Sequence, residues 1–335
     1  MEFVTSVLSH KRTLHLCSFA LLIAASASII PYMNDIFRDK LFEPIEIAVL
    51  YSFQPILLFS GAHVFIRRFL VAKAKIFTFV FALLSILLRF SINYVDSFWA
   101  VLPLQLFADL FMCPVLHIFH TSMKSQGMIT RREINYMTIT CRATIAFIIG
   151  SIVSATNNFS QFFYCYFVFA ILFLVSLWPI EIEDKDPSTD FAIWKDYDYI
   201  LDSLPNLILS IVLVTVGLAS SFQTVFLFVL IKDLDGSELI MGLSILTRCL
   251  AEIMFYLIPG KSFSDKRPIL IFCVCLSICA LGGQLYAFSM LEQPWYVIFI
   301  ELLSGLSFAL MRITSIRLFR QQLVAVTLKA QISEQ

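Results

Sequence analysis

The chain alternates ten apolar stretches with short charged loops, and most of the stretches are about 20 residues long. A helix of that length, rising about 1.5 Å per residue, crosses the roughly 30 Å of hydrocarbon in a bilayer. The sequence therefore predicts an all-α, multi-pass membrane protein with about 10 transmembrane helices. We place the helices over residues 16–33, 47–66, 76–94, 98–120, 136–155, 162–180, 207–231, 239–258, 268–290 and 295–318.

Composition supports this prediction. Hydrophobic residues make up 59% of the chain and charged residues 14%, whereas soluble domains have about 25% charged residues. Lipid offers no hydrogen-bond partner to the backbone, so a spanning segment must be a helix or part of a closed barrel. The alternating strands of a barrel are not visible in the sequence. The composition thus excludes a soluble fold and favours helices.

Basic residues gather in every second loop, which predicts a cytoplasmic N-terminus. Lys11 and Arg12 precede the first apolar stretch, which we interpret as a retained helix rather than a cleaved signal peptide. The loops on the opposite side contain fewer basic residues. The remaining basic residues of the predicted cytoplasmic side are Arg67, Arg68, Lys73, Lys75, Lys124, Arg131, Arg132, Lys261, Lys266, Arg267, Arg317 and Arg320.

An acidic segment at residues 181–206 divides the chain after the sixth stretch. It is too charged to cross a membrane, so we expect a cytoplasmic linker, with a regulatory or partner-binding loop as the alternative. The predicted organisation is a six-helix N-terminal half at residues 1–180, the linker, and a C-terminal half at residues 207–335 with four helices.

Comparison of the two halves indicates an internal repeat. Residues 51–53 correspond to residues 243–245 at an offset of about 192, and residues 105–124 correspond to residues 301–320 at an offset near 196. In both matches the two stretches would cross the membrane in the same direction. The repeat favours two six-helix halves over the inverted five-helix halves of a ten-helix carrier of the drug/metabolite type.

Short motifs in the C-terminal half carry a family resemblance. An Asp-Gly-Ser turn precedes Gly242-Leu243-Ser244, and the later motifs are Ala251-Glu252-Ile253, Pro294-Trp295, Glu301-Leu302-Leu303 and Phe308-Ala309-Leu310-Met311. Asn135-Tyr136, followed by Arg142 and Gly150, is similar to the opening of the family's fifth helix. In these motifs the chain resembles the major facilitator superfamily, in the branch that groups lactose-permease-like proteins with animal facilitator-domain proteins.

The chain also departs from that family. A member normally has twelve helices, whereas the apolar stretches end at the tenth, so we expect helices 11 and 12 to be absent. The Gly-x-x-x-Asp-Arg gate motif of the loop between helices 2 and 3 is altered, because Gly61 is followed by Phe65 and Ile66 at the Asp and Arg positions. The position after Met311 is usually aromatic and here is Arg312. These departures bear on transport more than on the fold.

Ionisable residues inside the apolar stretches are the candidates for chemistry, because each is costly in lipid and needs a partner or a wet cavity. Asp109 and His120 are eleven residues apart, which leaves about 20° between them on a helix. Glu301 and Arg312 have the same spacing. Each of these two helices therefore carries an acid and a base on one face.

The resemblance implies that helices 1, 4, 7 and 10 line a central cavity, where these acids and bases would converge. Arg248 and Glu252 have the i, i+4 spacing of an ion pair, which we interpret as structural. The alternative for every pair is that its charges neutralise each other and fix helix packing. The predicted substrate- and ion-binding residues are Asp109, His117, His120, Arg142, Glu301 and Arg312.

No nucleotide-binding loop, metal motif or nucleophile elbow is present, and the net charge is +0. We therefore predict no enzymatic activity, cofactor, metal or nucleic-acid partner. The leading hypothesis is a secondary active transporter that moves a small polar solute across a lipid bilayer by alternating access, with symport of protons as one form. The alternative is a transport-incompetent receptor or scaffold, or an incomplete copy of a transporter. Protein partners cannot be read from the sequence.

Overall fold

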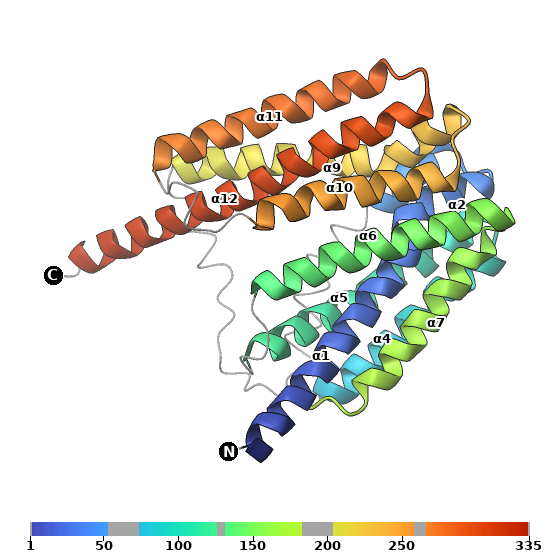
Figure 1. Ribbon diagram of the computed structural model, residues 1–335, viewed down its shortest axis with the longest axis horizontal. Helices are drawn as coiled ribbons and strands as arrows, with labels where there is room; N and C mark the ends of the chain where they lie inside the picture. Colours follow the sequence, from blue (N-terminus) through green and yellow to red (C-terminus); the bar gives the residue numbers. More distant parts are fainter. Residues whose placement is uncertain (1, 53–73, 126–130, 183–203, 258–265, 334–335) are drawn as a thin grey trace. The chain divides into compact units, whose positions relative to one another are not determined.

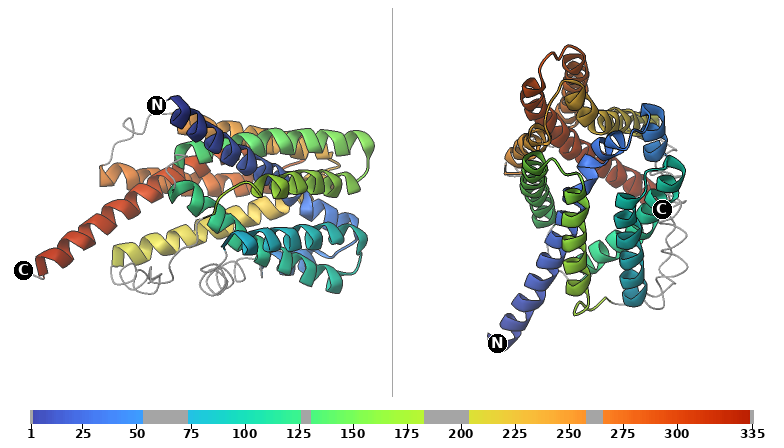
Figure 2. Two further views of the ribbon diagram at one scale, coloured as in Figure 1. Left: turned by 90° about the horizontal axis from the view of Figure 1, so that it is seen from below. Right: turned by 90° about the vertical axis from the view of Figure 1, so that its right-hand side faces the viewer.

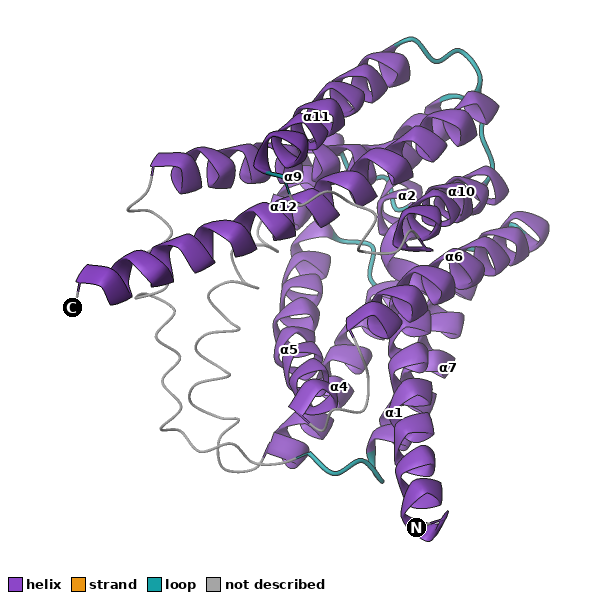
Figure 3. Cartoon of the chain, turned by 60° about the vertical axis from the view of Figure 1, so that its left-hand side comes forward, coloured by secondary structure: helices purple, strands orange, loops and turns teal. Residues whose placement is uncertain are grey.

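The computed structural model describes residues 2–52, 74–125, 131–182, 204–257 and 266–333. Within these ranges the regular elements are helices, joined by loops, and no strand occurs (Figure 3). The chain divides into two compact units, Met1–Thr189 and Asp190–Gln335. We call these the N-unit and the C-unit and describe each by itself.

In the N-unit, α1 packs against α6 and α7, and α4 packs against α5 and α7 (Figures 1 and 2). The ring of Phe119 stacks 6.4 Å from Phe19 of α1 and lies edge-on, 5.9 Å from Phe173 of α7. Each ring is at most 2% exposed, so this aromatic cluster joins three helices. The described helices of the N-unit are α1 (Glu2–Ile29), α2 (Met33–Asp39), α4 (Ala74–Ser91), α5 (Phe98–Ser125), α6 (Arg131–Thr156) and α7 (Ser160–Leu177).

The helical region at the start of the chain extends further than the sequence indicated, from Glu2 to Asp39 through α1, a 3₁₀ turn and α2. Pro31 lies in a 3₁₀ turn after α1, and the chain then continues as α2 rather than as a loop. The Tyr32 hydroxyl donates to the carbonyl of Ala146 at 2.6 Å and its ring stacks 4.4 Å from Phe162, which anchors the turn. Asp35, which the predicted span ending at residue 33 leaves in an outer loop, is only 2% exposed. The proline turn separates α1 from α2, and the helical region continues on both sides of it.

In the C-unit, α12 packs between α10 and α11 and also touches α9 (Figure 1). The crossing of α10 and α12 is close because Gly305 has no side chain. A Cβ atom there would lie 2.2 Å from the carbonyl oxygen of Arg248 and 2.8 Å from the Cβ of Ala251. Within the described residues the C-unit has α9 (Leu204–Asp233), α10 (Glu238–Leu257), α11 (Arg267–Ser289) and α12 (Val297–Ser333).

Seven helical segments of the described chain are long and apolar enough to cross a membrane. Side chains such as Leu218 (68% exposed) and Phe272 (66% exposed) suit contact with lipid. The prediction of an all-α, multi-pass membrane protein is therefore confirmed. Helices α9 and α10 are not among the seven, and α10 carries Arg248 and Glu252. Most of the predicted stretch 47–66, the altered gate motif at 61–66 and nearly all of the predicted linker lie outside the described residues.

The two units end α2 and α9 with the same type of turn. After α2, Leu41 has φ 63°, and the next amide donates to the carbonyl of Phe37 at 3.0 Å. After α9, Asp235 has φ 57°, and the next amide donates to the carbonyl of Ile231 at 2.8 Å. Both are helix C-caps in which a left-handed residue closes a wide hydrogen-bonded loop. The equivalent residues are 194 positions apart, close to the offsets at which the sequence repeats.

Candidate functional site

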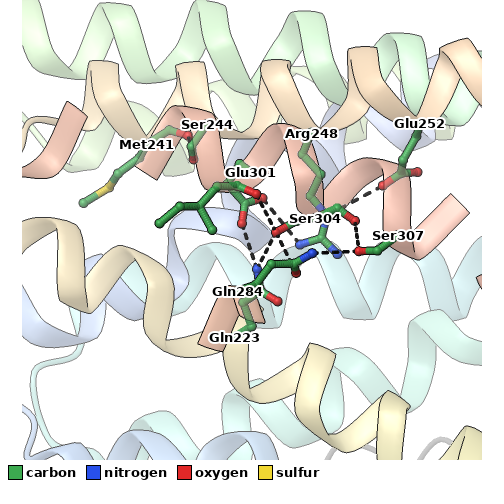
Figure 4. A network of polar contacts seen from close by, with 10 residues as sticks. Gln223, Met241, Ser244, Arg248, Glu252, Gln284, Glu301, Ser304 and Ser307 are labelled. Carbon is green, nitrogen blue, oxygen red and sulfur yellow. Dashed lines mark hydrogen bonds and ion pairs between the residues drawn. The ribbon is translucent and has the colours of Figure 1, made fainter. Parts of the chain in front are cut away.

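Polar side chains from α9, α10, α11 and α12, the helices described in the C-unit, meet in its interior (Figure 4). Gln223 is 5% exposed, Gln284 and Glu301 are 1% exposed, and Ser304 is 2% exposed. Polar groups buried between apolar helices are stable only when they find partners. We call this set the C-unit network, and it comprises Gln223 of α9, Arg248 and Glu252 of α10, Gln284 of α11, and Glu301, Ser304 and Ser307 of α12.

Hydrogen bonds join the two glutamines and two serines of the network, together with Glu301, into a chain. The side-chain nitrogen of Gln223 donates to Glu301 Oε1 at 2.9 Å and to Ser304 Oγ at 2.8 Å. Ser304 Oγ donates to Gln284 Oε1 at 3.1 Å, and Gln284 Nε2 donates to Ser307 Oγ at 2.8 Å. A continuous line of polar contacts therefore connects α9, α12 and α11.

The charged members are one base and two acids. Arg248 Nη1 lies 3.8 Å from Glu301 Oε2, and Arg248 Nε lies 3.6 Å from Glu252 Oε1. The guanidinium carbon also lies 5.3 Å from the ring centre of Phe308. Both ion-pair distances exceed the roughly 2.7–2.9 Å of a strong charge-assisted hydrogen bond. Arg248 is thus shared loosely between two carboxylates.

A cavity of about 20 Å³ adjoins this network. That space holds about one water molecule. One part of its wall is polar and the rest is apolar, so the cavity offers both hydrogen bonds and a hydrophobic surface. It is lined by Val216, Gln223, Arg248, Ser277, Leu281, Gln284, Ser304, Ser307, Phe308 and Met311.

The N-unit contains a different charged contact. Arg89 of α4 forms an ion pair with Asp109 of α5, and their exposed fractions are 4% and 6%. Gln105 Nε2 donates to the second carboxylate oxygen of Asp109 at 3.1 Å. Beside this pair, the Ser85 hydroxyl donates to the carbonyl of Ala108 at 2.8 Å. Asp109 is therefore held by a base and an amide between two helices.

The sequence spacing did not identify these ion-pair partners. Asp109 pairs with Arg89 of another helix, and Glu301 lies beside Arg248 of another helix. Eleven residues span about 16 Å of helix, so two side chains on one face are still too far apart to touch. Glu252 does meet Arg248 at the i, i+4 spacing.

The remaining predicted residues are Arg142, Arg312, His117 and His120. Arg142 on α6 and Arg312 on α12 are exposed. His117 and His120 belong to α5, but their side chains are outside the described part of the chain. The predicted convergence of Asp109 with Glu301 joins the two units and stays a prediction.

The sequence analysis did not identify several residues of the C-unit network and of the Arg89–Asp109 ion pair. Arg89 is a charged residue inside the apolar stretch 76–94, so the rule that identified Asp109 could have found it. Gln223 and Gln284 are uncharged, and a neutral amide in an apolar stretch gives a weaker signal. Ser304 gives almost none, because serine is common in membrane helices.

Three comparisons with known proteins agree with one another. A model of the MFS_1 like family matches residues 13–332. Two Xenopus laevis proteins, major facilitator superfamily domain-containing protein 6-like proteins A and B, are 30% and 28% identical to this chain over 147 residues. The match covers 43% of this chain and 24% of each relative, so the matched part corresponds to about a quarter of their length.

A solved structure is similar over most of the chain. A crystal structure of a mutant of the nucleoside transporter NupG aligns with a TM-score of 0.68, covering 91% of this chain and 81% of that one. The two sequences are 14% identical. At that identity the likeness concerns the fold.

Proposed function

Because the chain belongs to the MFS_1 like family, we propose that it is a secondary active transporter that moves a small polar solute by alternating access. The observation that carries this proposal is the C-unit cavity, where two amides and three hydroxyls surround a space beside the buried carboxylate of Glu301, inside an apolar bundle. Polar groups placed this way in a membrane protein are costly and typical of a substrate or ion pathway.

The cavity favours a solute with hydrogen-bonding groups. Gln223, Gln284 and the lining serines offer neutral donors and acceptors, while Phe308 and Met311 offer an apolar wall. At about 20 Å³ the cavity is far smaller than the roughly 300–1,000 Å³ of a typical ligand pocket. Binding therefore requires the helices to separate, as a change between inward-open and outward-open states would provide.

The shared arginine supports a proposal of proton coupling. With Glu252 and Glu301 both ionised, two acids share the guanidinium of Arg248 at 3.6 and 3.8 Å. When a proton neutralises one of these two carboxylates, the other carboxylate and Arg248 remain as one negative and one positive charge. The network can therefore exist with or without the proton, which a symporter requires. Asp109, His117, His120, Arg142 and Arg312 remain proposed residues of the solute pathway.

The proposed topology places the N-terminus in the cytoplasm, as the basic loops favour. Residues 1–180 and 207–335 are then the two membrane-embedded halves, and residues 181–206 form the cytoplasmic linker. Attaching a cysteine-reactive, membrane-impermeant label from one side of sealed vesicles would test this arrangement.

Uptake into proteoliposomes tests the transport proposal. The full chain would be reconstituted and offered a panel of labelled sugars, nucleosides, amino acids and organic acids, with and without a pH gradient. We expect at least one compound to accumulate with the gradient, and Glu301→Gln to lower its uptake more than about tenfold. Glu292→Gln, at an exposed position before α12, is the matched control and should transport normally. Folded protein that takes up no compound would favour a receptor or scaffold instead.

A further inference from the structure

We propose that Gln223 couples the protonation of Glu301 to the solute cavity by reversing its side-chain amide, which frees the carbonyl oxygen of Gln284 for a solute. This inference rests on the proposed function and assigns positioning roles to two glutamines. Figure 4 shows both amides beside Glu301 and Ser304.

The first step is that Glu301 sets the orientation of the Gln223 amide. Gln223 Nε2 lies 2.9 Å from Glu301 Oε1 and 2.8 Å from Ser304 Oγ, so its two hydrogens are directed at two oxygens. An ionised carboxylate only accepts hydrogen bonds, which obliges the amide to present nitrogen to it. The two ends of an amide have nearly the same shape, so the partner decides which end faces it.

The second step is that Ser304 can redirect its single hydroxyl hydrogen. Two acceptors lie at the same distance from Ser304 Oγ, Gln284 Oε1 at 3.1 Å and the carbonyl of Ile300 at 3.1 Å. The hydroxyl at the same time accepts from Gln223. A hydroxyl with several acceptors in reach changes partner by rotation alone.

The third step follows when one proton binds to Glu301. The proton enters on Oε1, because Oε2 is the oxygen that faces Arg248. The new O–H donates, so Gln223 turns over and presents its carbonyl oxygen to Glu301 and to Ser304. Ser304 then donates to Gln223, and Gln284 Oε1 loses its donor while Gln284 Nε2 keeps its bond to Ser307 at 2.8 Å. No other proton is gained or lost.

The consequence is an acceptor without a donor on the cavity wall. Gln284 is 1% exposed and lines the cavity, so a buried carbonyl oxygen there gains by accepting from a solute hydroxyl or amide. Proton binding therefore raises the affinity for a donor-bearing solute, and by linkage the solute raises the affinity for the proton.

The charged groups around Glu301 allow this coupling. Arg248 and Glu252 face it from α10. From α9 and α11 the polar side chains lining the cavity are Gln223, Ser277 and Gln284, which are neutral. Arg248 and the Gln223 amide thus contact different oxygens of the Glu301 carboxylate. The amide therefore responds to a proton that binds to Oε1, the oxygen that it contacts.

Infrared difference spectroscopy between acidic and alkaline pH tests the inference without any solute. The full chain, with ¹³C in its glutamine side-chain carbonyls, would be reconstituted in phosphatidylcholine vesicles. We expect a protonated-carboxyl band and a shift of the labelled glutamine bands with the same midpoint. Glu301→Gln should remove the glutamine shift and the part of the carboxyl band that belongs to Glu301, while the other carboxyl groups of the chain still titrate. Gln223→Met should keep the Glu301 part of the carboxyl band and lose the Gln223 part of the glutamine shift.

Other outcomes overturn the inference. A carboxyl band without any glutamine shift in the unsubstituted protein would contradict it, and that measurement needs no variant to fold. A full glutamine shift in Gln223→Met would contradict it too. Gln105→Met is the matched control, because Gln105 donates to Asp109, which Arg89 also holds. If this variant loses the shift, the signal belongs to the N-unit. A transporter without the amide reversal would still pass the uptake test.

Discussion

In the N-unit α4 crosses α5, and in the C-unit α11 crosses α12. The two crossings have a polar contact at the same spacing along the chain, but the contacting residues are of different types. In each, a side chain on the first helix bonds to one 20 residues later on the second, Arg89 to Asp109 in the N-unit and Gln284 to Ser304 in the C-unit. The equivalent residues are 195 positions apart, close to the offset of the repeated turns. The N-unit therefore uses an ion pair where the C-unit uses an amide and a hydroxyl.

The difference separates a rigid contact from an adjustable one. A buried ion pair resists separation, because each charge would be left without its partner in a medium of low dielectric constant. An amide and a hydroxyl exchange partners by rotation and lose one neutral hydrogen bond at most. We infer that the N-unit crossing holds its helices together, while the C-unit crossing, which lines a cavity, is able to rearrange as the proposed transport requires.

The largest change in stability is expected when the Arg89–Asp109 ion pair is broken. Arg89→Met should lower the free energy of unfolding by about 3–5 kcal/mol, because it leaves Asp109 charged and buried. The double variant Arg89→Met with Asp109→Leu should recover most of the loss, since neither charge remains. Thermal unfolding in detergent would compare the two, and equal losses would show that the ion pair is not the main stabilising contact.

The next largest effect is expected at Gly305, where α10 and α12 approach closely and Arg248 is positioned. Gly305→Ala should cost about 1–3 kcal/mol, because its Cβ would lie 2.2 Å from the Arg248 carbonyl oxygen. Gly283→Ala is the matched control on α11, where nothing lies within 4 Å of the added atom. Unfolding temperatures measure both. A Gly305→Ala protein as stable as the control would mean that α10 and α12 are not in tight contact.

Replacing the amide–hydroxyl contact of the C-unit with the ion pair of the N-unit tests the comparison directly. Gln284→Arg combined with Ser304→Asp would build the N-unit pair into the C-unit. We expect the protein to fold and its uptake to fall by about tenfold or more, the equivalent of about 1.4 kcal/mol in the transport barrier. Uptake assays on the transported solute would measure the loss. Normal uptake would show that the C-unit crossing does not need to rearrange.

The smallest effect concerns an exposed ion pair. Lys11 Nζ lies 3.0 Å from Glu181 Oε2, and this hydrogen bond, followed by the lysine charge, lowers the pKa of the Glu181 carboxyl. A lowered pKa in the folded state means that the contact stabilises above the unfolded pKa and is lost as the pH falls through the folded pKa. Both side chains are exposed, 48% and 77%, so the change should be barely detectable. Unfolding temperatures of Glu181→Gln and the unsubstituted protein across acidic pH would check this.

Much of the architecture was accessible from the sequence. The predicted stretch 98–120 became α5 at Phe98–Ser125, and the stretch 268–290 became α11 at Arg267–Ser289. The superfamily resemblance was confirmed by the family match over residues 13–332. The site was less accessible, because Glu301 was identified but its neighbours Gln223 and Gln284 were not. Their importance depends on which helices meet, and no single stretch contains that information.

The sequence by itself determined the helices and the membrane environment, because a run of about 20 apolar residues has one stable solution in lipid whatever surrounds it. The Arg248–Glu252 pair follows from spacing along one helix, but only the tertiary structure decided the partners of Asp109 and Glu301. Glu301 lies beside Arg248 because Gly305, one turn further along α12, lets the backbone of α10 come within contact. Packing between helices acts across many residues of sequence, so the spacing along one helix could not reveal it.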